Sequence, residues 1–467
     1  NKFPAMTTTA PTTPTTKPKQ KKNNKKKGPP TVVVSIPVGA PLTPRETLDE
    51  LLTRHRSPTT TTSTTAISTT TSPLVVVDTH GHTHLEEPSH EAYRLNDNDD
   101  DVPAKDIRLQ VQSLTCAVQE ADWQTCLDYV AQSPRHRIAA LGIHPWYLQG
   151  LLDDSNDNDT ATVTDAWLHR LEEQLQQNPG CMVGEIGLCK LARFVRTYAG
   201  GKTAALQLQR HVFAQQLTLA ARYRRPVSVH CVQQHGILLD IFRDVASTTT
   251  NHNNNNDDEE PEKKDPFSRL PTAIALHSFT GTAHQVQQLL EWEDKLRHPQ
   301  QPLSKKAAAA RRKNRNSNNQ TDSPGNNASE HPTKNNASIT TDNNDLLLCL
   351  PANDDSTASP PLLYFGFSHS INCDMCASPK SQRQALQAIR AVPDNRLLVE
   401  SDVHSTDNLV GGSLAALAYL AWALERPVAD VAQQTLENAQ RFFALVQKNQ
   451  EDIDDSGKPS VEQEVVS

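Results

Sequence analysis

The chain has 467 residues, a hydrophobic content of 36%, a net charge of −8 and a mean hydropathy of −0.59. This low apolar content excludes a chain that is globular throughout, because its long Thr, Asn, Asp and Pro tracts cannot bury a core. No apolar run approaches the roughly 18 residues of a membrane span, and no apolar leader segment for secretion is present. We therefore expect one large domain with disordered tails and insertions.

The eight cysteines contain no paired CxxC set. Cys373 and Cys376 have that spacing, but no second pair matches them, which argues against a zinc knuckle. A cytoplasmic or nuclear location, where thiols stay reduced, fits this cysteine usage best. The Lys-rich residues 17–27 are expected to form a solvated arm, with a nucleic-acid contact or a nuclear import signal as alternatives. Met6 is a candidate start, unless the chain is a fragment.

Residues 1–73 are rich in Thr, Pro and Lys, and we expect a disordered tail with one brief helix over 45–54. The folded domain is predicted over 74–447, and an acidic disordered tail over 448–467. Three polar insertions are expected in the loops of the domain, at 151–163, 247–266 and 299–343. Segments of such length and composition cannot pack as core, so they belong on the surface.

From Leu74 onward, short apolar runs alternate with amphipathic segments of helical length, which is the pattern of β/α units. Eight strands are predicted, at 74–78, 112–117, 137–143, 181–186, 226–230, 272–277, 362–367 and 396–401. Eight helices are predicted to follow them, at 119–131, 164–177, 204–223, 232–244, 282–297, 379–391, 411–424 and 427–447. An open doubly wound sheet usually carries a Gly-rich turn after its first strand, and none is present. The predicted fold class is therefore α/β, a (β/α)8 TIM-type barrel.

A histidine pair follows the first predicted strand. The β-branched run Val75–Val77 is typical of a buried parallel strand. It stops at Asp78, and His80 and His82 come directly afterwards. Side chains two residues apart in extended backbone point the same way, so both imidazoles can reach one metal ion. The motif alone is also compatible with a histidine-rich loop, but its place after a barrel strand favours a metal site.

Further imidazoles and carboxylates follow the later strands, where such barrels place their active sites. They are His144, Glu185, His230, His277 and Asp402. A single one of them could be a satisfied core histidine or an acid at a helix N-terminus. Their recurrence at one rim predicts a metal centre, and a set of nitrogen and oxygen donors suits two divalent ions better than one structural zinc.

The chemistry suggests a role for each group. Glu185 is the natural bridging ligand, because a carboxylate has two oxygens to share. Two ions about 3.5–4 Å apart lower the pKa of a bridging water and stabilise phosphoryl transfer. Asp402 is expected to bind metal and to accept the proton of that water. His144 is expected to bind the substrate phosphate, because the six other groups already complete a two-metal set.

These residues resemble the TatD family of metal-dependent deoxyribonucleases. The resemblance rests on six motifs in family order, Asp78-Thr79-His80-Gly81-His82, Gly142-Ile143-His144-Pro145, Gly184-Glu185-Ile186-Gly187-Leu188, Pro226-Val227-Ser228-Val229-His230, His277-Ser278-Phe279-Thr280-Gly281 and Glu400-Ser401-Asp402. Phe365-Gly366-Phe367-Ser368 and Glu437-Asn438-Ala439 add support. Several motifs and the long insertions are similar to those of fungal members.

The resemblance implies a barrel hydrolase that uses two Mg, Mn or Zn ions to cleave phosphodiester bonds in DNA. The metal ligands that it implies are His80, His82, Glu185, His230, His277 and Asp402. Cys189 stands where the family usually has Asp, so we expect altered support around the metal rather than its loss. Counting back from Leu85 would select His82 and His84 as the histidine pair; counting from Asp78 selects His80 and His82, which we prefer.

Three functions compete. A divalent-metal deoxyribonuclease or broader phosphodiesterase leads, with DNA as the substrate. The second is a weakly active or inactive barrel that recruits protein partners through its disordered tail and insertions, an idea motivated by Cys189. The third is a metal hydrolase of a small ester or amide. The basic block at 305–315 is expected to be a spacer, with a helical extension or a nucleic-acid contact as alternatives. No membrane partner is expected, and the oligomeric state stays open.

Overall fold

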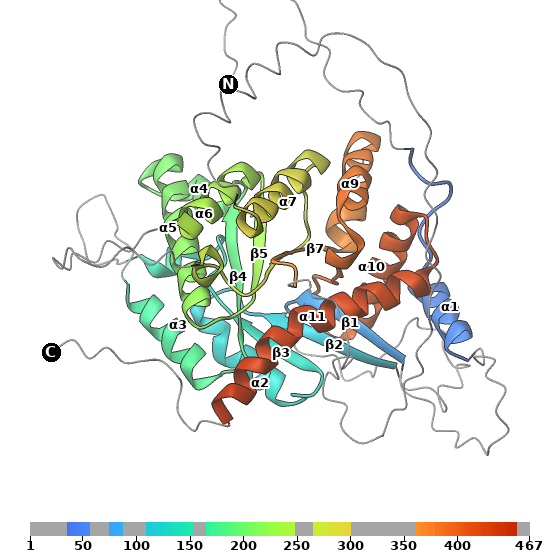
Figure 1. The fold of residues 1–467 in the computed structure, drawn as a ribbon, viewed down its shortest axis with the longest axis horizontal. Coiled ribbons are helices and arrows are strands. Elements are labelled where there is room, and N and C mark those ends of the chain that lie inside the picture. Colours follow the sequence, from blue (N-terminus) through green and yellow to red (C-terminus); the bar gives the residue numbers. More distant parts are fainter. Residues whose placement is uncertain are drawn as a thin grey trace, which may run out of the picture. The chain divides into compact units, whose positions relative to one another are not determined.

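Eight parallel strands form the inner wall of the fold (Figure 1). The computed structural model describes residues 35–56, 74–86, 109–152, 165–247, 265–299, 360–376 and 378–454. The strands are β1 (Leu74–Gly81), β2 (Leu109–Cys116), β3 (Arg137–Leu141), β4 (Met182–Cys189), β5 (Val227–Val232), β6 (Ile274–Leu276), β7 (Leu363–Phe367) and β8 (Leu397–Val399). Each strand pairs with the next one in sequence. The eight predicted strands and the barrel fold class are confirmed.

The barrel closes between β1 and β8 through contacts near the carboxyl ends of the strands. Thr79 Oγ1 donates to Val399 O at 2.9 Å, and the Asp402 amide donates to His80 O at 3.0 Å. The buried Asp78 carboxylate accepts from the Ser401 amide at 2.8 Å. Burial raises the pKa of the Asp78 carboxyl to about 7, although the hydrogen bonds from Ser401 oppose that shift. These bonds join the first and last strands directly below the predicted metal ligands.

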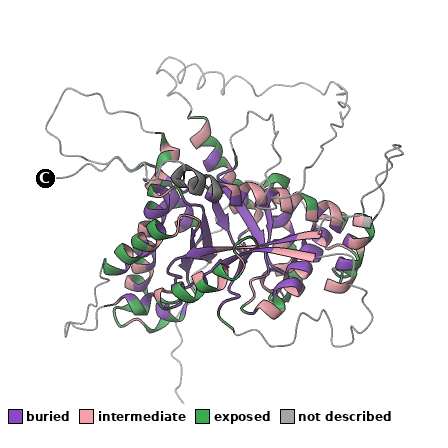
Figure 2. Cartoon of the chain, turned by 90° about the horizontal axis from the view of Figure 1, so that it is seen from below, coloured by how far each residue is buried: buried purple, intermediate pink, exposed green. Residues whose placement is uncertain are grey.

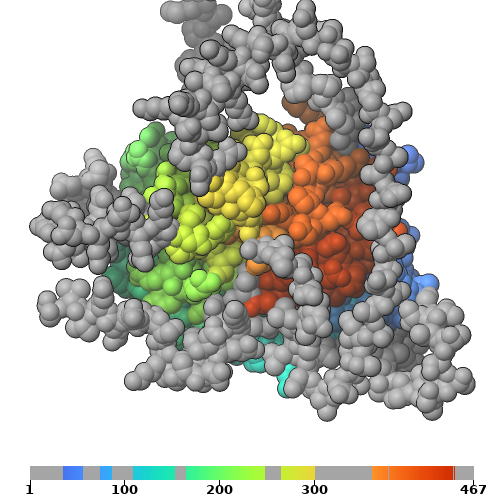
Figure 3. Space-filling model, viewed as in Figure 1, coloured from blue at the N-terminus to red at the C-terminus, as the bar shows by residue number. Residues whose placement is uncertain are grey.

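Helices surround the strands and expose their polar faces, while the strands are buried (Figure 2). The larger ones are α1 (Pro44–Arg56), α2 (Trp123–Ala131), α3 (Ala166–Gln177), α5 (Gly201–Arg222), α6 (His235–Ser247), α7 (Ala283–Arg297), α9 (Pro379–Ala391), α10 (Leu409–Leu424) and α11 (Val428–Asp454). A short α4 (Arg193–Thr197) follows β4. From α5 to α10, neighbours in the chain are also neighbours in space (Figure 3). None of the described helices has the length and apolarity needed to cross a membrane.

One end of the barrel is closed by α11, which crosses in front of the strands in Figure 1. Phe442 and Phe443 join the apolar cluster formed by inward-pointing strand residues such as Val77 and Leu398. The rings of Tyr364 and Phe442 lie 5.4 Å apart. Burial of these large apolar side chains at the amino ends of the strands stabilises the barrel and leaves its opposite rim for polar groups.

The helix α1 lies inside the segment 1–73, which the sequence assigns to a tail. It contacts both α10 and α11, and Leu48 and Leu51 are buried. Val428 N donates to Glu50 Oε1 at 3.1 Å, which joins α1 to the start of α11. Apolar side chains on one face of this helix therefore extend the described fold to before Leu74. At the other end, α11 runs to Asp454, beyond the expected boundary at 447.

The three predicted insertions, at 151–163, 247–266 and 299–343, lie almost wholly outside the described residues. Deletion of 303–343 is expected to leave the melting temperature and the metal content of the protein unchanged, because the deleted segment carries few apolar side chains for a core. Thermal melts of the full chain and of the shortened chain check this expectation. A drop in melting temperature of 10 °C or more would contradict the assignment of 303–343 to a surface insertion.

A buried carboxylate network joins α7 to the amino ends of β7 and β8. Glu293 is 1% exposed and accepts hydrogen bonds from the Leu362 amide at 2.9 Å and from Arg297 Nη2 at 2.7 Å. Arg396 Nη2 donates to the same carboxylate at 3.2 Å. Burial would raise the pKa of Glu293, but Arg396 and the other donors outweigh it and hold the pKa below 4.5.

Glu293→Gln is expected to lower the free energy of unfolding at pH 7 by about 3 kcal/mol, because it leaves the half-buried guanidinium groups of Arg297 and Arg396 without their counter-charge. A depressed pKa stabilises the fold above the unfolded value of 4.5, and this contribution is lost as the pH falls through the folded pKa. The difference in free energy of unfolding between wild type and variant should therefore become smaller below pH 4.5. Urea unfolding at several pH values measures this difference. Glu291→Gln, which changes an exposed acid on the same helix, is the matched control.

Candidate metal centre

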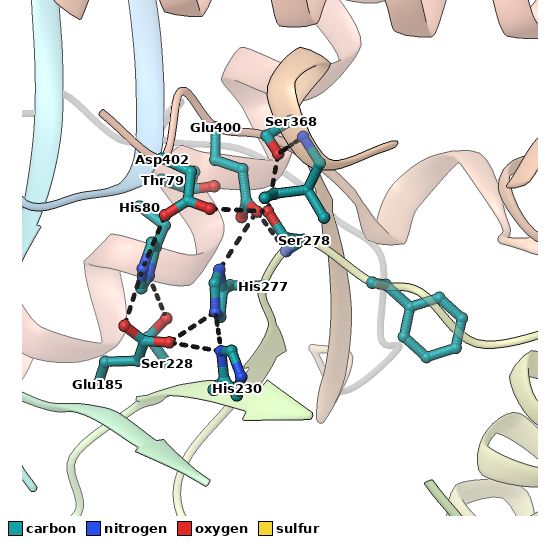
Figure 4. Close-up of polar contacts among 12 residues, drawn as sticks. Thr79, His80, Glu185, Ser228, His230, His277, Ser278, Ser368, Glu400 and Asp402 are labelled. Atoms are coloured by element: carbon teal, nitrogen blue, oxygen red, sulfur yellow. Dashed lines mark hydrogen bonds and ion pairs between the residues drawn. The ribbon is translucent and has the colours of Figure 1, made fainter. Parts of the chain in front are cut away.

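The Glu185 carboxylate contacts several histidines, and Figure 4 shows it beside His80, His230 and His277. It stands on β4, whose eight residues are all buried, and its amide donates to Ala117 O at 2.8 Å. Five imidazoles have a ring nitrogen within 3.5 Å of a Glu185 oxygen, and they belong to His80, His82, His144, His230 and His277. The carboxyl ends of β1, β3, β4, β5 and β6 therefore meet at one carboxylate, as the strand-end pattern predicts.

The two oxygens of Glu185 face different histidines. Oε2 lies 3.5 Å from His80 Nε2 and 3.1 Å from His82 Nε2. Oε1 lies 3.0 Å from His230 Nδ1 and 2.7 Å from His277 Nε2. One carboxylate thus lies between two pairs of candidate metal-binding histidines, with one oxygen facing each pair. This is the arrangement that a bridging ligand requires.

Asp402 follows β8 and reaches the first of these groups. Its Oδ1 lies 3.9 Å from His80 Nε2 and 3.7 Å from His82 Nε2. Its backbone has a φ of 55°, a left-handed conformation that Asp adopts more readily than most residues. Ser278 Oγ donates to Asp402 Oδ2 at 3.4 Å, and the side chain of Asp402 is 14% exposed. The carboxylate therefore faces the donors and is also open to solvent.

Hydrogen bonds on the far side of each ring orient His80 and His82. His80 Nδ1 lies 2.8 Å from Ser228 Oγ. His82 Nδ1 donates to Cys116 O at 2.7 Å, since a carbonyl oxygen only accepts. Nε2 of His82 therefore carries the lone pair that points to the cluster, which is the usual way in which an outer partner selects the tautomer of a ligand.

His84 lies elsewhere. Its Nε2 is 3.2 Å from Asp122 Oδ2, and Asp122 itself accepts from the Val118 amide at 3.0 Å. The structure therefore brings the pair His80 and His82 to Glu185, and not the alternative pair His82 and His84. The chain leaves β1 at Gly81, so the alternation of side chains along a strand does not extend to His84.

A second buried carboxylate, Glu400, supports His277. Its Oε1 lies 3.6 Å from His277 Nδ1 and accepts a hydrogen bond from the Ser278 amide. Gly366 on β7 makes room for it, since a Cβ at that position would lie 2.0 Å from Glu400 Oε2. The Glu400 carboxylate thus lies on the side of the His277 ring that faces away from Glu185, which is where an outer partner of a metal ligand stands.

His144 lies inside the cluster. Its Nε2 is 3.2 Å from Glu185 Oε1, and its ring centroid is 4.5 Å from that of His230. The following residue pair, Trp146 and Tyr147, is exposed at 52% and 38%, and the Trp146 ring lies 5.4 Å from the His144 ring. His144 therefore sits between the centre and an exposed aromatic surface.

Cys189, where the resemblance leads us to expect Asp, is buried beside His230. Burial would raise the pKa of its thiol, but hydrogen bonding with His230 and Trp146 lowers the pKa. The Cys189 amide donates to Gln209 Oε1 at 3.1 Å. Cys189 thus contacts a candidate ligand from outside the cluster, and its effect on the support of the metal stays a prediction.

The histidines and Glu185 perturb one another. Burial would raise the pKa of Glu185, but His144, His277 and His80 hold it well below its usual range. Burial lowers the pKa of His80 and lowers that of His144 to about 4. Burial also lowers the pKa of His277, but Glu185 outweighs it and raises the pKa well above its usual value. These groups bind metals as an ionised carboxylate with neutral imidazoles, so His277 has to lose its proton when an ion binds.

The donor set fits divalent cations. His80, His82 and Glu185 have ligand atoms that all lie within 4.8 Å of one another, and so do His144, Glu185 and His230. His80, His277 and Asp402 form a third such group. Imidazole and carboxylate donors suit zinc, manganese and magnesium. Glu185 and His80 each belong to two of these three groups.

Sequence reasoning did not identify the partners that orient the ligands, namely Ser228, the Cys116 carbonyl, Ser278 and Glu400. Ser228 could have been found, because it precedes His230 by two residues on one strand and so points to the same side. Glu400 precedes Asp402 by two residues. No signal in the sequence marks the Cys116 carbonyl, since any residue has one.

Comparison with known proteins finds a family model and a relative that are similar to this chain. A family model described as TatD related DNase matches residues 77–295. The Cut9-interacting protein scn1 of Schizosaccharomyces pombe is 22% identical over 351 residues, which are 65% of this chain and 83% of that protein.

Two solved structures are also similar. The TatD homologue YJJV of Escherichia coli K12 has a TM-score of 0.44 at 17% identity, over 79% of this chain and 98% of that one. An uncharacterized amidohydrolase of Saccharomyces cerevisiae has a TM-score of 0.43 at 12% identity, over 79% of this chain and 100% of that one. Residues 77–295 of the chain thus match the model of the TatD-related family, and the barrel with its histidine–carboxylate rim has the fold of that family's metal-dependent hydrolases.

Proposed function

We propose that this chain is a deoxyribonuclease that hydrolyses phosphodiester bonds with two divalent metal ions. The observation that carries the proposal is the position of Glu185, whose two oxygens face two groups of histidines. His80, His82 and Asp402 would hold one ion, His230 and His277 the other, and Glu185 both. The ions would be Mg, Mn or Zn, and when bound they would lower the pKa of a water and neutralise the phosphate.

The residues of the chain perform the remaining tasks. Asp402 is partly open to solvent and accepts from Ser278, so it can receive the proton of an attacking water. His144 borders the rim on the side of Trp146, where it can donate to a phosphate oxygen of the substrate. Its contact with Glu185 Oε1 at 3.2 Å also supports a second role as a ligand.

Aromatic and basic groups beside the rim support a nucleic-acid substrate. Trp146 is exposed next to His144, and an exposed ring of this kind can stack on a base. Gln209 Nε2 donates to Pro145 O and to Cys189 O, both at 3.1 Å, and so holds the loop of Trp146 beside the end of β4. The exposed Lys190 and Arg193 that follow β4 can contact phosphates there.

Metal content and cleavage of labelled single-stranded DNA test the proposal together. Two ions per chain at the Glu185 centre, and cleavage that a chelator abolishes, are expected. Bound metal without cleavage of DNA would overturn the nuclease assignment. Cleavage of small esters alone would then favour a metal hydrolase of a small ester or amide. The absence of bound metal would show that these histidines are not metal ligands.

His277→Ala is expected to lower the affinity for metal by more than the roughly 10–100-fold that is typical of a lost outer partner, because it removes a ligand itself. The fold should persist, since the barrel core lies at the other end of the strands. Titration with Mn and circular dichroism measure both effects. His84→Ala, which removes a buried histidine of the same rim outside the cluster, is the matched control. Wild-type metal content in the His277 variant would refute its assignment.

A second candidate function rests on the relative from Schizosaccharomyces pombe, whose name describes it as a Cut9-interacting protein. This chain would in that case recruit a protein partner and turn over DNA slowly or not at all. Stoichiometric metal without turnover, together with a partner captured by the full chain but not by a chain lacking 1–34, would favour it over the nuclease.

The seven described cysteines are unpaired thiols, which supports a reducing location such as the cytoplasm or nucleus. For the domain organisation, we keep the proposal of a barrel over 74–447 with disordered segments at both ends and in three loops, with α1 added to the barrel. Limited proteolysis of the full chain tests it, since cuts are expected in the three loops and before residue 35.

A further inference from the structure

A second cluster of metal-ligating side chains lies after β7, outside the centre at Glu185. It consists of His369, Cys373 and Asp374, whose ligand atoms all lie within 4.8 Å of one another. His369 Nδ1 lies 3.1 Å from Asp374 Oδ2. The His369 side chain is 30% exposed and that of Asp374 is 64% exposed, so an ion from solvent can reach them.

The cluster owes its geometry to a π-turn, Ser370–Asp374. The Met375 amide donates to Ser370 O at 3.1 Å, an i to i−5 bond that widens the turn. In a turn of this width, residues four and five positions after His369 return to the same side as His369. The local backbone therefore places imidazole, thiol and carboxylate next to one another.

Tertiary contacts hold this turn in place. The buried Asn372 accepts from the Ser368 amide at 2.9 Å and donates to Phe279 O at 3.0 Å. Tyr419 Oη donates to Asn372 O at 2.8 Å, which anchors the turn to α10. The donors are thus ordered before any ion arrives, which lowers the entropic cost of binding.

The turn also borders a cavity of about 370 Å³. His369, Ser370 and Asp374 line one side, and Ser401 and Val403, the neighbours of Asp402, line another. This cavity gives an ion a route to His369 and Asp374. It leaves room for water or an outside ligand to complete the coordination.

We propose that His369, Cys373 and Asp374 form a binding site for a divalent ion of the zinc type. A thiolate with an imidazole favours zinc or cobalt over magnesium and calcium, which prefer oxygen donors. Three protein ligands leave a fourth position open, as in zinc sites that bind water or substrate. This donor set differs from that of the Glu185 centre, whose candidate ligands are nitrogen and oxygen alone. The proposal does not depend on the nuclease assignment.

Titration of the chelator-treated full chain with Co(II) tests the proposal through its sulfur ligand. Thiolate bound to Co(II) gives a charge-transfer absorption band in the near ultraviolet, and nitrogen and oxygen donors do not. We expect the band in wild type and its loss in both Cys373→Ser and His369→Ala. Zinc content measured on the same proteins should fall by one ion per chain.

Three further variants separate this site from the Glu185 centre. The band should persist in Glu185→Gln, and it should persist in Cys116→Ser and Cys189→Ser, whose thiols lie near His80 and His230. Cys373→Ser should also retain cleavage of DNA in Mg or Mn, if the chain cleaves DNA. Absence of the band in wild type, or a band that survives Cys373→Ser, would overturn the proposal whatever the outcome for cleavage.

Discussion

Asp402→Asn is expected to lower the rate of DNA cleavage by about 10²–10⁴-fold, the contribution that a positioned general base usually makes. An amide cannot accept the proton of the attacking water. The fold should be unchanged, because Asn also adopts the left-handed backbone conformation of residue 402. The backbone N–H of residue 402 can still donate to His80 O. The rate is measured at saturating Mn, so that a weaker affinity for the ion does not lower it.

Asp122→Asn is the matched control for this variant. Asp122 is a buried carboxylate of the same rim that contacts His84, outside the cluster. It should retain the wild-type rate. A rate in Asp402→Asn within threefold of wild type would show that Asp402 does not accept the proton. In that case the buried Glu400 would be the next carboxylate to consider.

Glu185→Gln is expected to remove both ions and to abolish cleavage to well below a hundredth of the wild-type rate. The reason is that an amide offers one oxygen, while its NH2 group repels a cation, so it cannot serve the two donor groups at once. A variant that removes one ligand from one ion should lose less of the bound metal and of the cleavage rate. Metal analysis of the purified protein counts the ions directly, and a thermal melt shows whether the variant is folded.

The ion count distinguishes a shared ligand from a simple one. A loss of two ions per chain from wild type to Glu185→Gln would agree with a bridging role. A loss of one ion alone would mean that Glu185 serves a single ion, although its two oxygens face different histidines. Asp402→Asn should retain at least the ion of His230 and His277, since the Asp402 carboxylate lies within 4 Å of His80 and His82 in the other group.

The sequence by itself determined the fold class and which polar residues lie at the carboxyl rim of the barrel. Period and length of the apolar runs identify all eight strands, and a polar residue directly after a buried parallel strand lies at the carboxyl rim of the barrel in any case. This local rule sufficed for His80, Glu185, His230 and His277, because each stands on or next to a strand whose direction is known.

The tertiary structure alone decided what depends on loops and on distant partners. Whether His84 or His80 faces Glu185 depends on how the chain turns after Gly81, and His84 instead meets Asp122 from another β/α unit. His144 lies within the cluster because its loop is held by Gln209 on α5. The packing of α1 on α10 and α11 joins segments more than 350 residues apart. Such contacts follow from long-range packing, and no local pattern of residues encodes them.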